Sequence, residues 1–335
     1  MHAFIAGIEY CLPIQSLTTE DLVEEFPEWL SLRKTIQKTG VQRRQIADID
    51  ECASDLGVQA AQKLFAKGDC NPKDIDFILF CTQTADYALP ATACLVQDRL
   101  GISTTSGALD INMGCSGFIY SLGLAIGLIN SGQANSILLI TAETISKYLD
   151  RRDRSSRAIF GDGAAAIWIR SGERQSIGPF CYGTDGSGGE NLIVRDSGMR
   201  RSLEQENSSA SSENPFGART MFMDGQKIFD FALRVVPLSV SALLQKSGLT
   251  VDDIGLFVLH QANAYLLEEL RKMLGIAKEK FQITISDCAN TVSSTIPIAL
   301  KHADLEGKLK NGEKIMLVGF GVGYSWAACI VEWKD

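Results

Sequence analysis

The stretch from Leu109 to Gly132, LDINMGCSGFIYSLGLAIGLINSG, constrains this chain more than any other. An apolar strand leads into a tight turn at Met113 and Gly114, and a helix is predicted from Cys115. The helix has large apolar residues on every side and no polar stripe, which is typical of a helix buried in a core. Because the first turn of a helix presents unpaired N–H groups and a positive dipole end, we expect the Cys115 thiolate to be favoured over the thiol.

Two other interpretations of this stretch need weighing. A cysteine here can be the nucleophile of covalent acyl transfer, but most free cysteines are simply packed in a core. A membrane span is the second alternative, since no charged residue lies between Asp110 and Glu143. The apolar helix ends at Ser131 and Gly132, short of the ~20 apolar residues that a bilayer requires, and we exclude the span.

Composition narrows the class of protein. The 335 residues are 45% hydrophobic and 21% charged, which fits a globular protein with an ample core. A net charge of -8 argues against broad electrostatic binding to nucleic acid. Nine cysteines without a CxxC pair indicate reduced thiols rather than a disulfide framework. The N-terminus, MHAFIAGIEYCLP, lacks the basic and long apolar regions of a signal peptide and is predicted to form a strand.

The second half of the chain repeats the order of the first. When the halves are laid over each other at an offset of 179 residues, Cys81, which ends the apolar run 76–81, falls on His260. Further on, the apolar run 136–140 has its counterpart at 314–318. Such self-similarity suggests two related α/β halves that share a buried core, although apolar strands can also resemble each other by chance. The polar, serine-rich segment 202–215 between them is predicted to be a surface loop.

Three stretches carry side chains suited to chemistry. They are NMGCSG at 112–117, LHQAN at 259–263 and CANTVSST at 288–295. His260 ends a buried strand, at the sheet edge where α/β proteins bind ligands, although a lone histidine there can also be structural. Together the cysteine, histidine and asparagine form a set suited to acyl transfer with stabilisation of an oxyanion or carbanion.

The chain resembles the β-ketoacyl-acyl-carrier-protein synthase III family of the thiolase-like superfamily, from about Ile5 to Trp333. The resemblance implies a thiolase-like α/β fold, with αβαβα layers made of two pseudo-repeated five-stranded halves, and a homodimer. We place the halves at residues 1–172, with the cysteine, and 173–335, with the histidine and asparagine. The matching segments are TGVQRRQIA at 39–47, the Cys115 turn, IFGDGAAA at 159–166, HQAN at 260–263, ANTVSSTIPIAL at 289–300 and GFGVGYSW at 319–326.

The resemblance also implies roles for individual residues. Cys115 matches the acylated nucleophile, and His260 and Asn290 match the residues that bind the malonyl thioester carbonyl during decarboxylation. Loss of CO2 places negative charge on that oxygen, which two donors held there stabilise. The backbone N–H groups of Cys115 and Val322 match the oxyanion hole of the acylation step.

The substrate-binding set follows from the same resemblance. Trp29 and Arg154 match the residues that enclose the adenine of coenzyme A, and Arg33 matches a further basic residue at that mouth. Leu89 replaces a phenylalanine that caps the acyl pocket from the partner subunit in short-chain members. Asn263 and Phe320, within two of the matching segments, complete the expected set.

Several departures from the family pattern leave the acyl chain and its carrier open. Segment 33–40 is longer than usual, and Tyr265 stands where many members have an arginine that meets coenzyme A or the carrier protein. Val322 replaces a small residue of the glycine-rich loop. Because leucine is smaller than phenylalanine, the exchange at Leu89 predicts a looser pocket.

We therefore expect a condensing enzyme that takes an acyl group from acyl-CoA and joins it to malonyl-ACP or malonyl-CoA. We expect no cofactor or metal, a cytoplasmic homodimer, and no binding to nucleic acid or membrane. The alternative is an acyltransferase of secondary metabolism that passes the acyl group to oxygen or nitrogen, with His260 as general base. A non-catalytic scaffold subunit would need none of the three polar residues. A hydroxymethylglutaryl-type synthase would need an acidic base, which 81–84 lacks, and a degradative thiolase would need a second cysteine where Phe320 stands.

Overall fold

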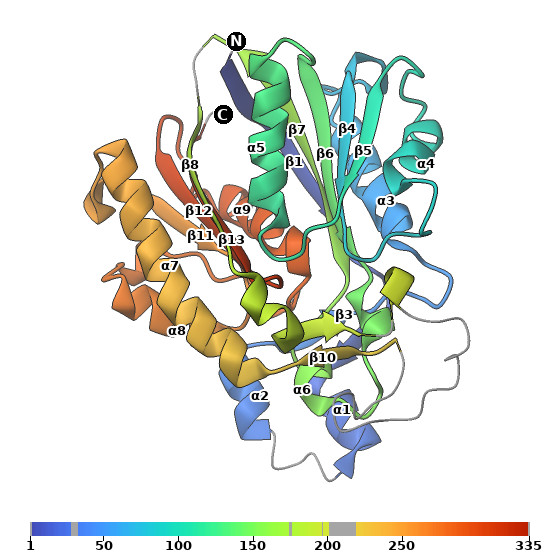
Figure 1. Ribbon diagram of the computed structural model, residues 1–335, viewed down its shortest axis with the longest axis vertical. Coiled ribbons are helices and arrows are strands. Elements are labelled where there is room, and N and C mark those ends of the chain that lie inside the picture. The colour runs from blue at the N-terminus through green and yellow to red at the C-terminus, as the bar shows by residue number, and fades with distance from the viewer. Residues whose placement is uncertain (1, 28–32, 174–175, 196, 201–218, 334–335) are drawn as a thin grey trace.

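Two sheets form the framework of the computed structural model, which describes residues 2–27, 33–173, 176–195, 197–200 and 219–333. Figure 1 shows the sheets with helices between them and outside them. The first has five strands in the order β1-β7-β6-β4-β5, and the second has four in the order β11-β12-β13-β8. Their bounds are β1 (His2–Cys11), β4 (Phe77–Cys81), β5 (Gly107–Ile111), β6 (Ser136–Glu143), β7 (Gly163–Gly172), β8 (Ile177–Thr184), β11 (Leu256–Leu259), β12 (Lys314–Gly321) and β13 (Ser325–Glu332).

The sheets and helices stack in five layers. Along β6, Ile137 and Leu139 join the apolar cluster between the two sheets, whereas Leu138 and Ile140 join the cluster on the outer face. This alternation follows from the two-residue period of a strand covered on both faces. The central helices are α5 (Gly117–Asn130) and α9 (Thr295–Leu305), and the outer ones are α3 (Ala53–Phe65), α4 (Thr92–Arg99), α7 (Gly225–Ser247) and α8 (Ala264–Met273). The predicted αβαβα layering is confirmed.

Two helices, α5 and α7, are apolar enough to be compared with membrane spans. In α5, Phe118, Ile119 and Leu122 are fully buried between the sheets, as the missing polar stripe predicts. Among the described residues, α7 alone is long and apolar enough to cross a bilayer. Its Phe231 and Val236 are buried in the cluster that covers the outer face of the second sheet. α5 is therefore a helix of the protein core, and α7 packs one face against the second sheet.

The internal repeat extends to the turns between elements. The 3-10 turns η2 (Pro72–Asp74) and η7 (Val251–Asp253) are 179 residues apart, and each precedes a strand with a parallel neighbour, β4 or β11. Cys81 ends β4, and His260 directly follows β11, at the same offset. The first sheet ends with β7 at Gly172 and the second begins with β8, which supports the division at residue 172 that we propose for the two halves.

The second sheet lacks the fifth strand that the family resemblance implies, so that prediction is wrong for the described residues. At the corresponding place, Phe281 makes a single parallel bridge to Phe257. Beyond the bridge, the Gln261 side chain takes the place of a strand ladder. Its amide accepts the Thr284 N–H at 2.7 Å and donates to the Leu259 carbonyl at 2.6 Å. Backbone groups that a strand would pair are thus satisfied by a side chain.

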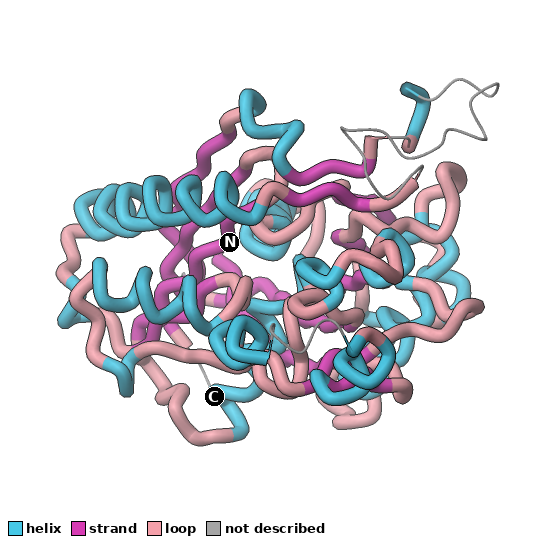
Figure 2. The backbone as a smooth tube through the Cα atoms, turned by 90° about the horizontal axis from the view of Figure 1, so that it is seen from below, coloured by secondary structure: helices cyan, strands magenta, loops and turns pink. Residues whose placement is uncertain are grey.

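Short elements gather at one end of the molecule, beyond the carboxyl end of β6. Figure 1 shows them at the bottom, and Figure 2 shows the same end from below. They surround the loops that follow the central strands, where ligand sites lie in α/β folds. The predicted loop 202–215 lies outside the described residues. The short elements are β2 (Ser16–Thr18), α1 (Thr19–Glu25), α2 (Arg33–Thr39), β3 (Arg43–Gln45), η3 (Ile145–Tyr148), α6 (Arg154–Arg157), η4 (Gly186–Asn191), β9 (Leu192–Val194), η5 (Gly198–Arg200), β10 (Met221–Met223) and η9 (Val292–Ser294). A further short turn, η8 (Lys278–Lys280), lies instead beside η7, before the start of β11.

Candidate active site

Cys115 lies in the turn between β5 and α5. The Gly117 N–H donates to the Gly114 carbonyl at 2.7 Å, which closes the turn, and α5 begins at Gly117 rather than at the cysteine. The end of β12 presses against it, since a Cβ built on Gly321 would lie 2.7 Å from the Cys115 sulfur. Only glycine leaves room for the thiol there, and the side chain is buried.

The expectation of a favoured Cys115 thiolate is wrong. Burial raises the pKa of the Cys115 thiol to about 12, and the nearby Glu143 carboxylate adds to the rise. The Val322 backbone N–H donates to the sulfur and lowers the pKa, but by less than burial raises it. Desolvation of the charged form therefore outweighs the dipole of a helix that starts two residues later. The thiol needs a base before it can attack.

His260 supplies a candidate base at the end of β11. Its Nδ1 lies 2.7 Å from the Thr295 hydroxyl, which itself donates to the Val292 carbonyl at 3.1 Å. Because the Thr295 hydroxyl donates its proton to that carbonyl, we assign the ring proton of His260 to Nδ1, which leaves the lone pair on Nε2. Burial lowers the pKa of His260 to about 3, so the imidazole is neutral. The His260 and Phe320 rings pack edge to face, with their centroids 5.5 Å apart. The glycines on either side of Phe320 lie against the cysteine turn, Gly319 against Ser116 and Gly321 against Cys115.

Asn290 sits in a strained turn before α9. Ala289 and Val292 both have positive φ values, 56° and 53°, which are rare for residues with a side chain and most unusual for valine. The Asn290 Oδ1 accepts the Val292 N–H at 3.0 Å, which leaves the Nδ2 amide free to donate. A parallel bridge to Phe160 fixes the backbone against the first half. The turn therefore holds an amide donor in one orientation.

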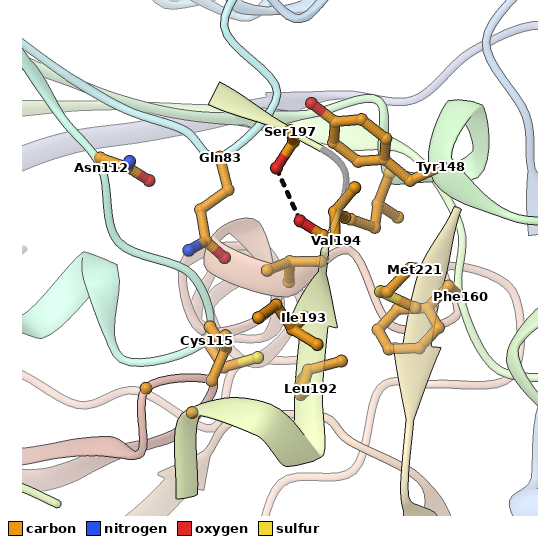
Figure 3. A pocket seen from close by; sticks show the side chains of 15 residues that line it. Gln83, Asn112, Cys115, Tyr148, Phe160, Leu192, Ile193, Val194, Ser197 and Met221 are labelled. Carbon is orange, nitrogen blue, oxygen red and sulfur yellow. Dashed lines mark hydrogen bonds between the residues drawn. The ribbon is translucent and has the colours of Figure 1, made fainter. Parts of the chain in front are cut away.

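A cavity of about 380 Å³ opens beside the cysteine. Figure 3 shows the Cys115 sulfur pointing into it, toward Leu192 and Ile193. Its wall is mainly apolar, as a pocket for an acyl chain would be. The lining residues are Gln83, Asn112, Cys115, Ile145, Tyr148, Phe160, Gly189, Leu192, Ile193, Val194, Ser197, Met221, Val292, Val322 and Gly323.

Glu143 is the residue of this region that sequence reasoning missed. It ends β6 and is fully buried, where its carboxylate accepts the Gln83 N–H at 3.1 Å and the Ser293 hydroxyl at 2.9 Å. Burial raises the pKa of Glu143 to about 8. Segment 81–84 has no acidic residue of its own, but Glu143 contacts it from β6 and does not line the cavity. A glutamate ending an otherwise apolar strand, SILLITAE, was the available signal.

Arg33 and Arg154, two of the residues expected to hold coenzyme A, do not line the cavity. Arg33 is exposed at the start of α2 and faces a separate groove with Gln37 and Gln42. Arg154 is exposed at the start of α6. Trp29 lies outside the described residues. Their assignment stays a prediction from the family pattern.

The other expected substrate contacts have mixed placements. Leu89 is 83% exposed and does not line the cavity of its own chain. Asn263 caps α8, because its side-chain oxygen accepts the Leu266 N–H at 2.9 Å. Phe320 is buried against His260 and supports the histidine rather than facing the cavity.

The described residues hold no group of three or more histidine, cysteine, aspartate or glutamate side chains suited to a metal ion. All nine cysteines have free thiols. The chemistry that these residues can supply is therefore a thiol, a neutral imidazole, an amide donor and backbone N–H groups.

Comparison with known proteins agrees with this geometry. Residues 109–186 match the family described as 3-oxoacyl-[acyl-carrier-protein (ACP)] synthase III, and residues 244–333 match the C-terminal part of the same family. The β-ketoacyl-[acyl-carrier-protein] synthase III of Clostridium acetobutylicum is 35% identical over 332 residues, which covers 98% of each chain. The enzyme of the same name from Clostridium perfringens is 38% identical and covers 95% of this chain and 94% of its own.

A solved structure extends the likeness to the fold. The 2.1 Å crystal structure of a 3-oxoacyl-(acyl-carrier-protein) synthase III is 44% identical and superimposes with a TM-score of 0.94. The match covers 99% of this chain and 100% of the other. This chain therefore belongs to the 3-oxoacyl-[acyl-carrier-protein] synthase III family of acyl-transferring condensing enzymes.

Proposed function

We propose that the chain takes an acyl group from acyl-CoA onto Cys115 and condenses it with a malonyl thioester, malonyl-ACP or malonyl-CoA. The observation that carries the proposal is the orientation of three groups in one region. They are a protonated thiol, an imidazole whose Nε2 is an acceptor, and an amide whose Nδ2 is an unused donor. Coenzyme A enters only as part of the substrate, and no metal or other cofactor takes part.

In the first half-reaction the Cys115 sulfur attacks the acyl-CoA carbonyl while His260 Nε2 takes the thiol proton. The Cys115 and Val322 backbone N–H groups hold the oxyanion that forms, and this support is aimed where charge develops. The bond to the coenzyme A sulfur then breaks, and the imidazolium returns the proton to that sulfur. A base is required because the resting thiol has a pKa of about 12.

In the second half-reaction a malonyl thioester loses CO2. The electron pair of the broken C–C bond moves to the thioester oxygen, which accepts hydrogen bonds from Asn290 Nδ2 and from His260 Nε2. The enolate carbon then attacks the acyl-Cys115 carbonyl, the C–S bond breaks, and the released thiolate takes a proton from water. Asn290 is suited to this role because its turn is fixed before the substrate arrives.

We propose a homodimer that binds coenzyme A through Trp29, Arg33 and Arg154 and works in the cytoplasm, in fatty acid or secondary metabolism. The strand β5 is the outer strand of the first sheet, and its Leu109 is exposed together with Leu89. An unpaired strand edge with exposed apolar residues favours pairing with a second copy. Nine free thiols fit a reducing compartment.

The experiment uses the two half-reactions separately. After incubation with acyl-CoA, peptide mapping should place the added acyl mass on Cys115 among the nine cysteines. Asn290→Ala should leave this acylation within about tenfold and reduce CO2 release from malonyl-CoA by about 10²–10³, the usual effect of losing one such donor. Acyl mass found chiefly on Cys81, Cys288 or Cys329 would overturn the assignment.

A further inference from the structure

We propose that Thr295 is a positioning residue that lets His260 accept a proton in one half-reaction and donate a hydrogen bond in the next. The inference rests on the proposed function, because the two half-reactions require opposite protonation states at Nε2 of His260. During acylation Nε2 needs a lone pair to take the Cys115 proton. During decarboxylation Nε2 needs a proton to donate to the thioester oxygen.

The resting structure shows only the first of these states. Thr295 is the first residue of α9 and is 2% exposed. Its hydroxyl donates to the Val292 carbonyl at 3.1 Å and receives Nδ1–H of His260 at 2.7 Å. A carbonyl can only accept, so while the Thr295 hydroxyl donates to Val292 the ring proton belongs on Nδ1, and Nε2 is left without a proton.

A hydroxyl can reverse this arrangement, since it has one proton and two lone pairs. When the Thr295 hydroxyl turns from the Val292 carbonyl to Nδ1, that nitrogen becomes the acceptor and the ring proton belongs on Nε2. The ring loses one proton to water from Nδ1 and gains one from water at Nε2, so the starting and final tautomers are both neutral. A neutral ring suits the site, because burial strongly disfavours the imidazolium form.

The two hydroxyls before Thr295 are engaged elsewhere. Ser293 donates to Glu143 at 2.9 Å, and Ser294 bonds Thr141 at 3.0 Å. Both bonds cross from the second half to β6 of the first half. Among the described residues, Thr295 is the one whose hydroxyl contacts the His260 ring, so the exchange of donor and acceptor depends on it.

The deciding variant is Thr295→Val, which keeps the branched shape and removes the hydroxyl. Nδ1–H then faces only the Val292 carbonyl, which locks Nε2 as an acceptor. Acylation of Cys115 should stay within about threefold of wild type, while CO2 release from malonyl-CoA should fall by about 10²–10³, as for a lost oxyanion donor. Thr295→Ser should restore CO2 release. Ser294→Ala, which removes a neighbouring buried hydroxyl, should leave the ratio of the two rates unchanged.

Nitrogen NMR of ¹⁵N-histidine protein provides a readout that does not depend on turnover. The chain has only three histidines, and Thr295→Val should show His260 solely with its proton on Nδ1, before and after acylation. Equal loss of both rates, unchanged CO2 release, or a proton on Nε2 in this variant would overturn the role of Thr295. A wild type that releases no CO2 would instead count against the proposed function, and the NMR result would still decide on Thr295.

Discussion

Gly321→Ala tests how closely the end of β12 fits the nucleophile. The added Cβ would lie 2.6 Å from the Cys115 Cβ and 2.7 Å from its sulfur, whereas ordinary contact begins at 3.4 Å. The sulfur and the strand must therefore separate by about 0.7 Å. Neither can move easily, because Gly321 pairs with Ser325 in the sheet and Cys115 is held in the turn before α5.

The expected effects differ for stability and for chemistry. Overpacking of this kind costs about 1–3 kcal/mol of unfolding free energy. A shift of the nucleophile approaching 1 Å should slow acylation by about 10²-fold, because near-attack geometry is lost. Chemical denaturation measures the first effect, and the rate of acyl-Cys115 formation by intact-mass spectrometry measures the second.

Gly127→Ala provides a matched control. It makes the same substitution inside α5, where an added Cβ meets nothing within 4 Å. This variant should be more stable by about 0.5–1 kcal/mol, since alanine replaces glycine within a helix, and should acylate at the wild-type rate. A Gly321→Ala protein that acylates as fast as wild type would refute the argument that this glycine sets the position of the sulfur.

Three further results are expected. The rate of Cys115 alkylation by iodoacetamide should rise about tenfold per pH unit from pH 7 to 10, because burial raises the thiol pKa to about 12. A rate that reaches its plateau below pH 8 would show a stabilised thiolate instead. Burial raises the pKa of Glu143 from 4.5 to about 8, so between these pH values the native state keeps a proton that the unfolded state loses, and stability falls as pH rises. The melting temperature of Glu143→Gln should therefore rise relative to that of wild type from pH 5 to 8. A difference in melting temperature that is constant with pH would contradict this. Leu89→Phe should shift preference toward short acyl-CoAs by about 1–3 kcal/mol in relative transition-state binding, whereas an unchanged chain-length profile would show that Leu89 does not cap a partner's pocket.

The repeat and the buried central segments could be predicted from apolar patterns, whereas the αβαβα layering was predicted from the family resemblance. The missing polar stripe of the helix after Cys115 and the continuous apolar run 136–140 require burial on all sides, and both segments are central in the structure. The shortened second sheet could not be predicted. It depends on the Gln261 side chain reaching the Thr284 N–H, a contact between residues 23 positions apart that no periodicity records.

The pKa shifts of the site residues were harder to predict than the identity of those residues. Sequence alone places Cys115 near a helix start but does not show that it is buried, and burial decides the sign of its pKa shift. Glu143 was missed for a similar reason. Its donors, Gln83 and Ser293, come from distant segments, and only the packing of the two halves brings them together.

The most direct test of the central claim is the balance between CO2 and product. The wild-type protein would be given acyl-CoA together with malonyl-ACP or malonyl-CoA, and CO2, free coenzyme A and the acyl product would be quantified. The account predicts one CO2 released for each new 3-ketoacyl thioester, and no 3-ketoacyl thioester from Cys115→Ala. Acyl transfer to an alcohol or amine without CO2 release would contradict it and favour the plain acyltransferase.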